Sequence, residues 1–544
     1  MWGVSKSNVV ARVLVGDRLE CQVVSPQGDR LTLTGNTTDV EPKVEGSAEL
    51  AGNHALVHNA WAFAKFTYLK VNLPSQEEQE GAEKRAKAHR DVAEWITDLA
   101  DGPRRTARQG WCSACFAEVE HQKVKRPVGQ LPAYLCSNCG SPTLPCAGPG
   151  CDNMALRGRG AIRVPRYCAE HRHEIPSFAK AEAKMATLGD YEEFLAYDKP
   201  NLSRTAKLVG FGLTGLFVGA PAALVAAPAI GGAVGTLIGG YSGAAATSYG
   251  LALLGGGSLA AGGLGMAGGT VVVTALGGTL GSALGASVTN AYVREDKSFH
   301  VELMQGGQGV PVVVCNGFLS ESGRGWGEWK EIVTTRYSDS PVYRVHWGAK
   351  ELKDLGALAS LGAVKVAGPA KLKQAASAAN RFGAKKLGPL GPALVAADLA
   401  KNPWHVAKNR ADKTGVVLAD LLARTDADSY VLVGHSLGAR AMVVAAQTLG
   451  TKPDGPQVET AHLLGTAIGA KADCDTLTAR VNDAVYNYHS ANDNVLKYLY
   501  AVAQAGQTAA GLNGFTSSPP KLENIDVSAQ VERHSDYHTN VTLL

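Results

Sequence analysis

The sequence predicts an α/β fold with a mostly parallel sheet over residues 300–544. Two observations indicate it. Short runs of apolar and β-branched residues alternate with amphipathic segments after residue 300, as a parallel sheet covered by helices requires. In the stretch "YVLVGHSLGARAMVVAAQTL" (430–449), an apolar run enters a tight Gly-x-Ser-x-Gly turn and then an alanine-rich helix. Strand, turn and helix in this order predict a nucleophile elbow.

The part of the chain before this domain is expected to contain further modules, because 544 residues are too many for one core. Residues 1–104 combine short β-like runs with a charged, helix-favouring segment, and they indicate no function. Charged residues interrupt every apolar run in the first 25 positions, so we expect no secretory signal and a location on the cytoplasmic side. The net charge of +4 gives nucleic-acid binding no support.

Residues 105–176 contain seven of the ten cysteines. Two C-x2-C pairs separated by twenty residues have the spacing of a zinc ribbon. This first set is Cys112, Cys115, Cys136 and Cys139. The second set is Cys146, Cys151, Cys168 and His171, with His173 as the alternative to His171. Paired knuckles favour metal over a disulfide framework. We therefore predict two structural Zn²⁺ ions, each with four protein ligands.

An uncharged tract lies within the next predicted segment, 205–295. From Leu208 to Val293 there are 86 consecutive residues without Asp, Glu, Lys or Arg, and 23 of them are glycine. A bilayer span needs about 20 apolar residues, so the tract is long enough for two to four passes. Glycine recurs every four residues from Gly231 to Gly243, as in close helix packing within membranes. The alternative is a glycine-rich helical hairpin buried against the following domain.

The elements of the α/β domain are predicted from the pattern of apolar residues. Strands are expected at 310–318, 341–347, 430–433, 460–469, 483–490 and 523–528, and helices at 326–336, 413–424 and after the elbow. Residues 350–413 interrupt the alternation of strands and helices. They form an apolar insertion that has 12 Lys or Arg against 4 Asp or Glu. Basic and apolar character together favour a lid on an anionic membrane surface, and a solvated helical excursion is the alternative.

Ser436 at the tip of the elbow is the predicted nucleophile, and a purely structural turn is the alternative. A serine hydroxyl needs a histidine to accept its proton and a carboxylate to orient that histidine. Asp493 follows the strand that ends near His489 and is the predicted acid. His534, the first histidine after the last strand, is the predicted base. Weaker choices are Asp473, Asp475, Asp483 and Asp526 for the acid, and His538 and His489 for the base.

The negative charge that develops in acyl transfer requires backbone N–H donors. One is expected from Leu437, directly after the nucleophile. The other is expected from Phe318 in "VVVCNGFLS", where Asn316 and Gly317 would shape the turn.

Four stretches of the domain resemble one known family. They are "YVLVGHSLGARAM", "HLLGTAIG", "YNYHSANDNVLKYLY" and "ENIDVSAQVERHSDYH", preceded by the glycine-rich "LALLGGGSLAAGGLGMAGG". Together they resemble the DUF726 family of α/β hydrolases, which includes the transmembrane and coiled-coil domain protein 4 group, over residues 205–544. The resemblance implies a membrane-associated serine hydrolase. It also implies that Asp493 is the catalytic acid and His534 the catalytic base. This sequence differs from the family pattern at Arg533, where the resemblance leads us to expect a glycine.

These patterns favour a lipase or esterase that cleaves acyl esters of membrane lipids through a serine acyl-enzyme. The competing class is a membrane-perturbing or trafficking protein that uses the glycine-rich hairpin and keeps the hydrolase fold as a scaffold. Nucleic-acid binding by the cysteine-rich segment is the weakest class, because it offers few aromatic residues for base stacking.

Overall fold

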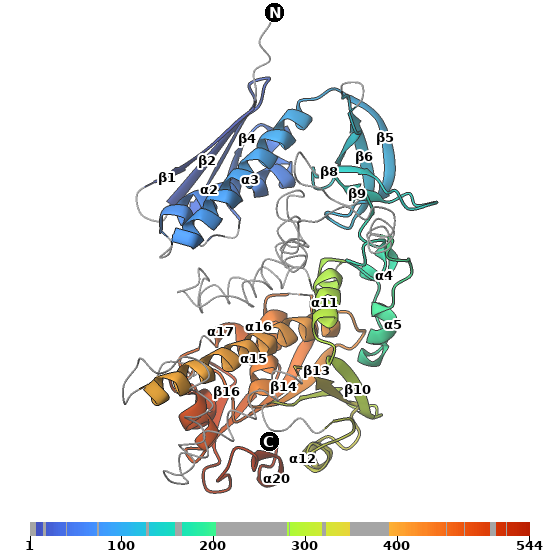
Figure 1. The fold of residues 1–544 in the computed structure, drawn as a ribbon. Helices are drawn as coiled ribbons and strands as arrows, with labels where there is room; N and C mark the ends of the chain where they lie inside the picture. Colours follow the sequence, from blue (N-terminus) through green and yellow to red (C-terminus); the bar gives the residue numbers. More distant parts are fainter. Residues whose placement is uncertain are drawn as a thin grey trace, which may run out of the picture. The chain divides into compact units, whose positions relative to one another are not determined.

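The computed structural model (Figure 1) describes residues 7–14, 18–37, 39, 41–72, 76–126, 130–157, 166–202, 280–281, 283–317, 323–348, 391–452, 454–472, 474–500, 507–517 and 519–544. They form two compact units, one built mostly from residues up to Ala183 and one mostly from Tyr292–Leu544. Most of the uncharged tract, residues 350–390 of the basic insertion, and Phe318 lie outside the described residues. Within the described part, no helix combines the length and apolarity needed to cross a membrane.

The first unit begins with a four-stranded antiparallel sheet in the order β1-β2-β3-β4. Its strands are β1 Asn8–Val13, β2 Arg18–Val24, β3 Arg30–Asn36 and β4 Lys43–Gly46. Helices α2 His54–Asn72 and α3 Gln76–Ala100 lie side by side over this sheet, after a short helix α1 Ala48–Ala51 (Figure 1). Alternate residues of β2, from Leu19 to Val23, are buried against the helices, because a strand presents every second side chain to one face.

A five-stranded antiparallel sheet in the order β5-β6-β7-β8-β9 follows. Its strands are β5 Arg104–Trp111, β6 Glu118–Val124, β7 Ala133–Cys136, β8 Pro142–Pro145 and β9 Met154–Leu156. The β5–β6 connection carries Cys112 and Cys115, and the β7–β8 connection carries Cys139 directly after the strand that ends at Cys136. The two predicted knuckles therefore lie at strand ends of one sheet.

Short elements connect the regular parts of the chain. They are α4 Phe178–Ala181, the 3₁₀ turn η1 Leu188–Asp190, α5 Tyr191–Leu195 and α11 Ala283–Glu295.

The second unit is built on a seven-stranded sheet in the order β10-β12-β11-β13-β14-β15-β16. Its strands are β10 His300–Gln305, β11 Val312–Cys315, β12 Val342–His346, β13 Ser429–His435, β14 Gln457–Leu464, β15 Val485–His489 and β16 Leu522–Asp526. All neighbouring pairs are parallel except β10 with β12. The chain thus has the mixed α/β architecture with the mostly parallel sheet that the sequence predicts.

Helices cover this sheet. They are α12 Lys330–Arg336, α15 Gly391–Ala423, α16 Leu437–Gly450, α17 Asp475–Thr478, the π-helix η7 Val495–Tyr500, α19 Ala510–Asn513 and α20 Tyr537–Asn540. Helices α15 and α16 lie side by side (Figure 1). Alternate valines of β11 and β13 pack with Trp329, Val333 and Tyr537 into one buried cluster. This packing fixes the carboxyl ends of the central strands, where the predicted site residues lie.

Two elements differ from the sequence-based expectation. Strand β10 is an antiparallel edge strand in "HVELMQ" that the pattern of apolar residues does not predict. Helix α15 begins at Gly391, so the helix expected from residue 413 starts inside the predicted insertion.

Candidate functional site

Ser436 occupies the turn between β13 and α16, in a backbone conformation that few residues adopt. Its φ is 58° and its ψ is −119°. A non-glycine residue with positive φ costs of order 1–3 kcal/mol, and such strain clusters at functional sites. Ser436 directly precedes the first turn of α16 and is 1% exposed. The turn therefore holds the hydroxyl in a fixed place at the carboxyl end of the sheet.

The glycines on either side of Ser436 are required by close backbone contacts. A Cβ at Gly434 would lie 2.6 Å from Cα of Ala439, and a Cβ at Gly438 would lie 2.6 Å from the carbonyl oxygen of Asn316. Real Cβ atoms do not approach other heavy atoms so closely, and the contacts are with backbone that has no room to shift. The Gly-x-Ser-x-Gly spacing is thus dictated by the tightness of the turn.

The turn after β11 lies against the turn that carries Ser436. A Cβ at Gly317 would lie 2.7 Å from the backbone nitrogen of Leu437 and 2.7 Å from Cβ of Ser436. The two segments predicted to form an oxyanion hole are therefore adjacent. Of the two predicted donors, Leu437 is the first residue of α16, and Phe318 lies outside the described residues.

Asn316 fixes the backbone of this turn through three hydrogen bonds. Its Oδ1 accepts from Nε1 of Trp329 at 2.9 Å and from Nε of Arg344 at 2.9 Å. Its backbone carbonyl accepts from Nε1 of Trp347 at 2.9 Å. Because Asn316 is fully buried, these bonds anchor the turn at a point adjacent to Gly317.

Asp493 and His534 form a short, buried hydrogen bond. His534 Nδ1 lies 2.6 Å from Asp493 Oδ2, with the two side chains 2% and 0% exposed. The other oxygen, Oδ1, accepts from the backbone N–H of Leu496 at 3.0 Å. A carboxylate partner places the proton of a neutral imidazole on Nδ1, which leaves Nε2 as the basic nitrogen.

His534 is also held from its backbone side, next to the serine turn. Nε2 of His435, the residue before Ser436, donates to the carbonyl oxygen of His534 at 2.9 Å. Burial lowers the pKa of His435 well below its ordinary value, so His435 is neutral near pH 7. This bond joins the last loop to the end of β13 without adding a positive charge beside His534.

The alternative bases have other surroundings. His538 packs its ring edge-on against Trp329, and its Nδ1 lies 3.2 Å from Oε2 of Glu328. Burial lowers the pKa of His538 to about 4. His489 lies at the end of β15.

The alternative acids are placed as follows. Asp483 accepts from Thr460 at 3.3 Å, and Asp526 accepts from the hydroxyl of Ser528 at 2.5 Å. Asp475 begins α17, and Asp473 is outside the described residues. Arg533, at the position where the resemblance leads us to expect glycine, pairs with Asp536 and is largely exposed.

One ion pair that supports the serine turn was not identified from the sequence. Arg440, in the first turn of α16, binds Asp412 of α15 through two bonds of 2.6 Å and 3.1 Å. Its Nη1 also donates to the carbonyl oxygen of Ala467 at 3.4 Å. Bidentate pairing gives direction as well as attraction, so it orients α16 relative to α15. The partners are 28 positions apart in the sequence, so no local pattern reveals the ion pair.

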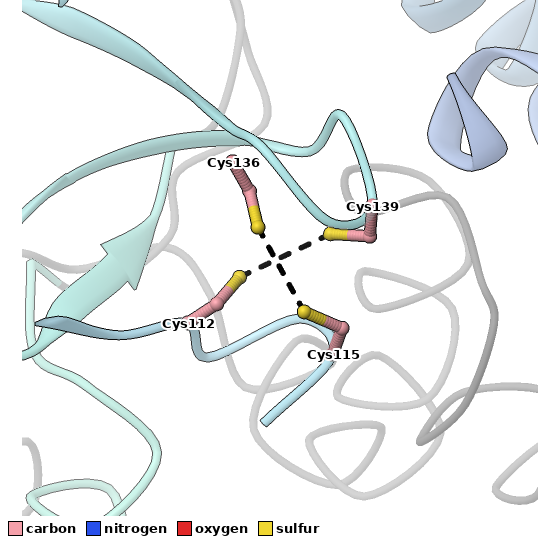
Figure 2. A group of neighbouring side chains, drawn as sticks. All are labelled: Cys112, Cys115, Cys136 and Cys139. Atoms are coloured by element: carbon pink, nitrogen blue, oxygen red, sulfur yellow. Dashed lines mark hydrogen bonds between the residues drawn. The ribbon is translucent and has the colours of Figure 1, made fainter. Parts of the chain in front are cut away.

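Four cysteines at the strand ends of the β5–β9 sheet converge (Figure 2). The sulfur atoms of Cys112 and Cys139 are 4.0 Å apart, and those of Cys115 and Cys136 are 3.8 Å apart. None of the ten cysteines forms a disulfide. A tetrahedral ion with Zn–S bonds of about 2.3 Å sets its sulfur ligands about 3.8 Å apart, so this group fits such an ion.

The second group brings together Cys146, Cys151, Cys168 and His171. Cys151 and Cys168 have their sulfur atoms 3.8 Å apart, and His171 Nδ1 lies 3.6 Å from Cys146 Sγ and 3.3 Å from Cys168 Sγ. His173 instead stacks on Tyr197, with Nε2 2.7 Å from the carbonyl oxygen of Lys199. The structure therefore places His171, and not His173, among these thiols.

Backbone N–H groups point at sulfur in both groups. Ala114 donates to Cys112 at 3.3 Å, and Gly148 and Cys168 donate to Cys146 at 3.3 Å and 3.2 Å. Such bonds stabilise thiolate over thiol, which is the form that binds metal. Both groups could hold a metal ion.

Comparison with known proteins identifies a family match over the part of the chain that contains the β10–β16 sheet. A family model described as "Protein of unknown function (DUF726)" matches residues 203–544. An uncharacterized membrane protein of Schizosaccharomyces pombe is 33% identical over 150 residues, which cover 27% of this chain and 19% of that protein. A protein named transmembrane and coiled-coil domain-containing protein STS1, from Oryza sativa, is 31% identical over 148 residues, or 26% of this chain and 22% of that protein.

A third relative, named probable lipase MIL1, comes from Saccharomyces cerevisiae. It is 27% identical over 286 residues, which cover 51% of this chain and 26% of that protein. The matched segments thus span about a fifth to a quarter of the length of these relatives. No solved structure matches the chain. Because the family model covers more than half of the sequence, this chain belongs to the DUF726 family.

Proposed function

We propose that this chain is a serine hydrolase of the α/β-hydrolase type that cleaves acyl esters, with Ser436 as nucleophile, His534 as base and Asp493 as the acid that orients it. The observation that carries the proposal is the strained Ser436 turn at the end of the same sheet that brings Asp493 within 2.6 Å of His534. These groups occur in the chain order serine, acid, histidine that α/β hydrolases use.

In the proposed reaction, Ser436 Oγ attacks the ester carbonyl while His534 Nε2 takes its proton. The oxyanion is stabilised by the N–H of Leu437 and by a donor from the turn after Gly317, for which we propose Phe318. His534 then gives the proton to the leaving alcohol, and an acyl-enzyme remains. Water, deprotonated by His534, attacks the acyl group, releasing the acid and restoring Ser436.

We propose lipid as the substrate class. One relative is named a probable lipase and two are named membrane or transmembrane proteins, and those names support a site that works at a bilayer. The 86 uncharged residues from Leu208 to Val293 and the basic, apolar insertion at 350–413 give this chain the composition for contact with an anionic membrane surface.

We further propose that the two cysteine groups bind structural Zn²⁺. Each offers four protein ligands and leaves no position for substrate, which is the arrangement of structural zinc. The sulfur–sulfur distances of 3.8 to 4.0 Å support this assignment.

The Asp493→Asn variant tests the role of the acid. We expect turnover of a p-nitrophenyl ester to fall by about 10³- to 10⁴-fold, because an amide in place of the carboxylate favours the wrong imidazole tautomer. The amide keeps Oδ1 as acceptor for the Leu496 N–H, so the fold should be retained, as circular dichroism would verify. An Asp483→Asn variant is the matched control and should keep its turnover; equal losses in both variants would remove Asp493 from the proposed site.

Deleting residues 208–279, which keeps helix α11 intact, tests membrane association. We expect the intact protein in the membrane pellet and the deletion variant in the soluble fraction, with labelling by a fluorophosphonate probe retained in both. If the intact chain is soluble without detergent, the tract does not anchor it and the membrane part of the proposal is wrong.

A further inference from the structure

A third group of metal-ligating side chains lies in the second unit and is independent of the cysteine groups. His300 and Glu302 are on β10, and His346 ends β12. One ligand atom from each residue lies within 4.8 Å of the other two. The proposed hydrolase reaction does not use any of the three side chains.

The strand register brings these residues together. His300 pairs directly with His346 in the antiparallel β10–β12 ladder, and Glu302 is two residues further along β10, so it shares the face of His300. The two imidazole rings are stacked, with centroids 3.9 Å apart and planes 4° from parallel. His346 Nε2 lies 3.3 Å from Glu302 Oε2. The face thus presents two imidazoles and a carboxylate at one point.

The tautomer of His300 is determined by its neighbour. Nδ1 lies 3.0 Å from the backbone carbonyl oxygen of Ser298, which only accepts, so Nδ1 carries the proton. Nε2 is then a lone-pair nitrogen; it is buried and makes no hydrogen bond. Metal-binding histidines almost always donate their other ring N–H to a carbonyl or carboxylate in this way. A buried lone-pair nitrogen beside a carboxylate is an arrangement that a bound cation would satisfy.

Glu302 is oriented by a second bond and links the group to the rest of the domain. The backbone N–H of Gly325 donates to Glu302 Oε2 at 3.0 Å. The carbonyl oxygen of Gly325 accepts from Arg344, which also holds Oδ1 of Asn316 at 2.9 Å. Glu302 is thus joined through two residues to the turn that lies against Leu437.

We propose that His300, Glu302 and His346 bind a divalent transition-metal ion of the zinc class, with three protein ligands and a fourth position open to water. Two imidazoles and one carboxylate are a ligand set that Zn²⁺ accepts. The ion cross-links the edge strand β10 to β12 and holds Glu302, and with it Gly325, in one position. Unlike the cysteine groups, this site has no sulfur ligand, so its metal exchanges more readily.

Isothermal titration of the full-length protein with ZnCl₂ tests the site, after weakly held metal has been removed on a chelating resin that leaves the cysteine groups loaded. We expect one additional ion per chain. Loss of even an outer partner of a ligand lowers metal affinity by about 10- to 100-fold, so His300→Ala and Glu302→Gln should each weaken this binding by at least about tenfold. His54 is exposed and lies outside all three groups. The His54→Ala variant is therefore the matched control and should bind Zn²⁺ as the wild type does.

Cobalt substitution distinguishes this site from the cysteine groups. Co²⁺ added to the resin-treated protein should bind without the intense thiolate-to-cobalt charge-transfer band, and Glu302→Gln should lose this binding. Glu302→Gln retains a side-chain oxygen for the Gly325 N–H, so it decides the question if His300→Ala does not fold. Absence of an additional ion in the wild type, or unchanged affinity in Glu302→Gln, overturns the proposal.

Discussion

Ser436→Ala is expected to abolish labelling by a fluorophosphonate probe and to reduce ester turnover to background. The probe reacts with an activated serine, and Ser436 is the positive-φ residue at the junction of β13 and α16. The substitution removes one oxygen atom and keeps a Cβ, so the turn should survive it. Intact labelling of Ser436→Ala would show that the turn is structural and would reject the hydrolase proposal.

His534→Ala should lower turnover by about 10⁴-fold or more, because a serine hydroxyl without a base is a poor nucleophile. The two groups act as one unit, so the double variant Ser436→Ala/His534→Ala should be scarcely worse than either single variant. Both effects are measured by kcat/KM on a series of p-nitrophenyl esters of increasing chain length.

His538→Ala is the matched control, because His538 is another buried histidine of the same last segment and contacts His435. It should retain activity comparable to the wild type. If it is inactive while His534→Ala remains active, the base is His538 with Glu328 as its partner, and the assignment of His534 is wrong although the nucleophile stands.

The parts of the site that the sequence could predict depend on local pattern or on chain order. Gly434 and Gly438 are visible as a motif because the turn excludes a Cβ at both positions. Chain order points to Asp493, because it follows a strand and precedes His534, and the structure places the two side chains in contact across 41 residues. The two cysteine sets were visible because metal knuckles require fixed short spacings.

The features that escaped prediction depend on register and on packing between distant elements. Arg440 and Asp412 meet because α15 and α16 lie side by side. The residues next to each of them in the sequence do not predict this ion pair. His300 faces His346 only because β10 adds to the sheet in antiparallel register. The first four residues of "HVELMQ" in β10 alternate polar and apolar, but periodicity alone does not identify the partner strand.

Loss of one cysteine ligand is expected to remove a zinc ion and unfold the β5–β9 sheet around it. Structural zinc contributes about 10–16 kcal/mol of apparent binding free energy in small zinc modules, which is comparable to the typical stability of a whole domain of about 5–15 kcal/mol. Cys139→Ser alters a buried ligand whose backbone carbonyl also accepts from the N–H of Ala55 at 2.9 Å, so α2 should lose an anchor as well.

The resin-treated wild type should contain two zinc ions per chain by elemental analysis, and Cys139→Ser and Cys168→Ser should each contain one. Hydrogen exchange should accelerate in β6 and β7 for Cys139→Ser, while probe labelling of Ser436 persists because it belongs to the other compact unit. Cys21→Ser, at a buried cysteine of β2 outside both groups, should keep both ions. Three pairs of ligand atoms among Cys146, Cys151, Cys168 and His171 lie 3.3 to 3.8 Å apart, a spacing that fits one ion. This second site therefore predicts a zinc ion that depends on Cys168. A wild-type content of one zinc, lost in Cys139→Ser and retained in Cys168→Ser, would reject it.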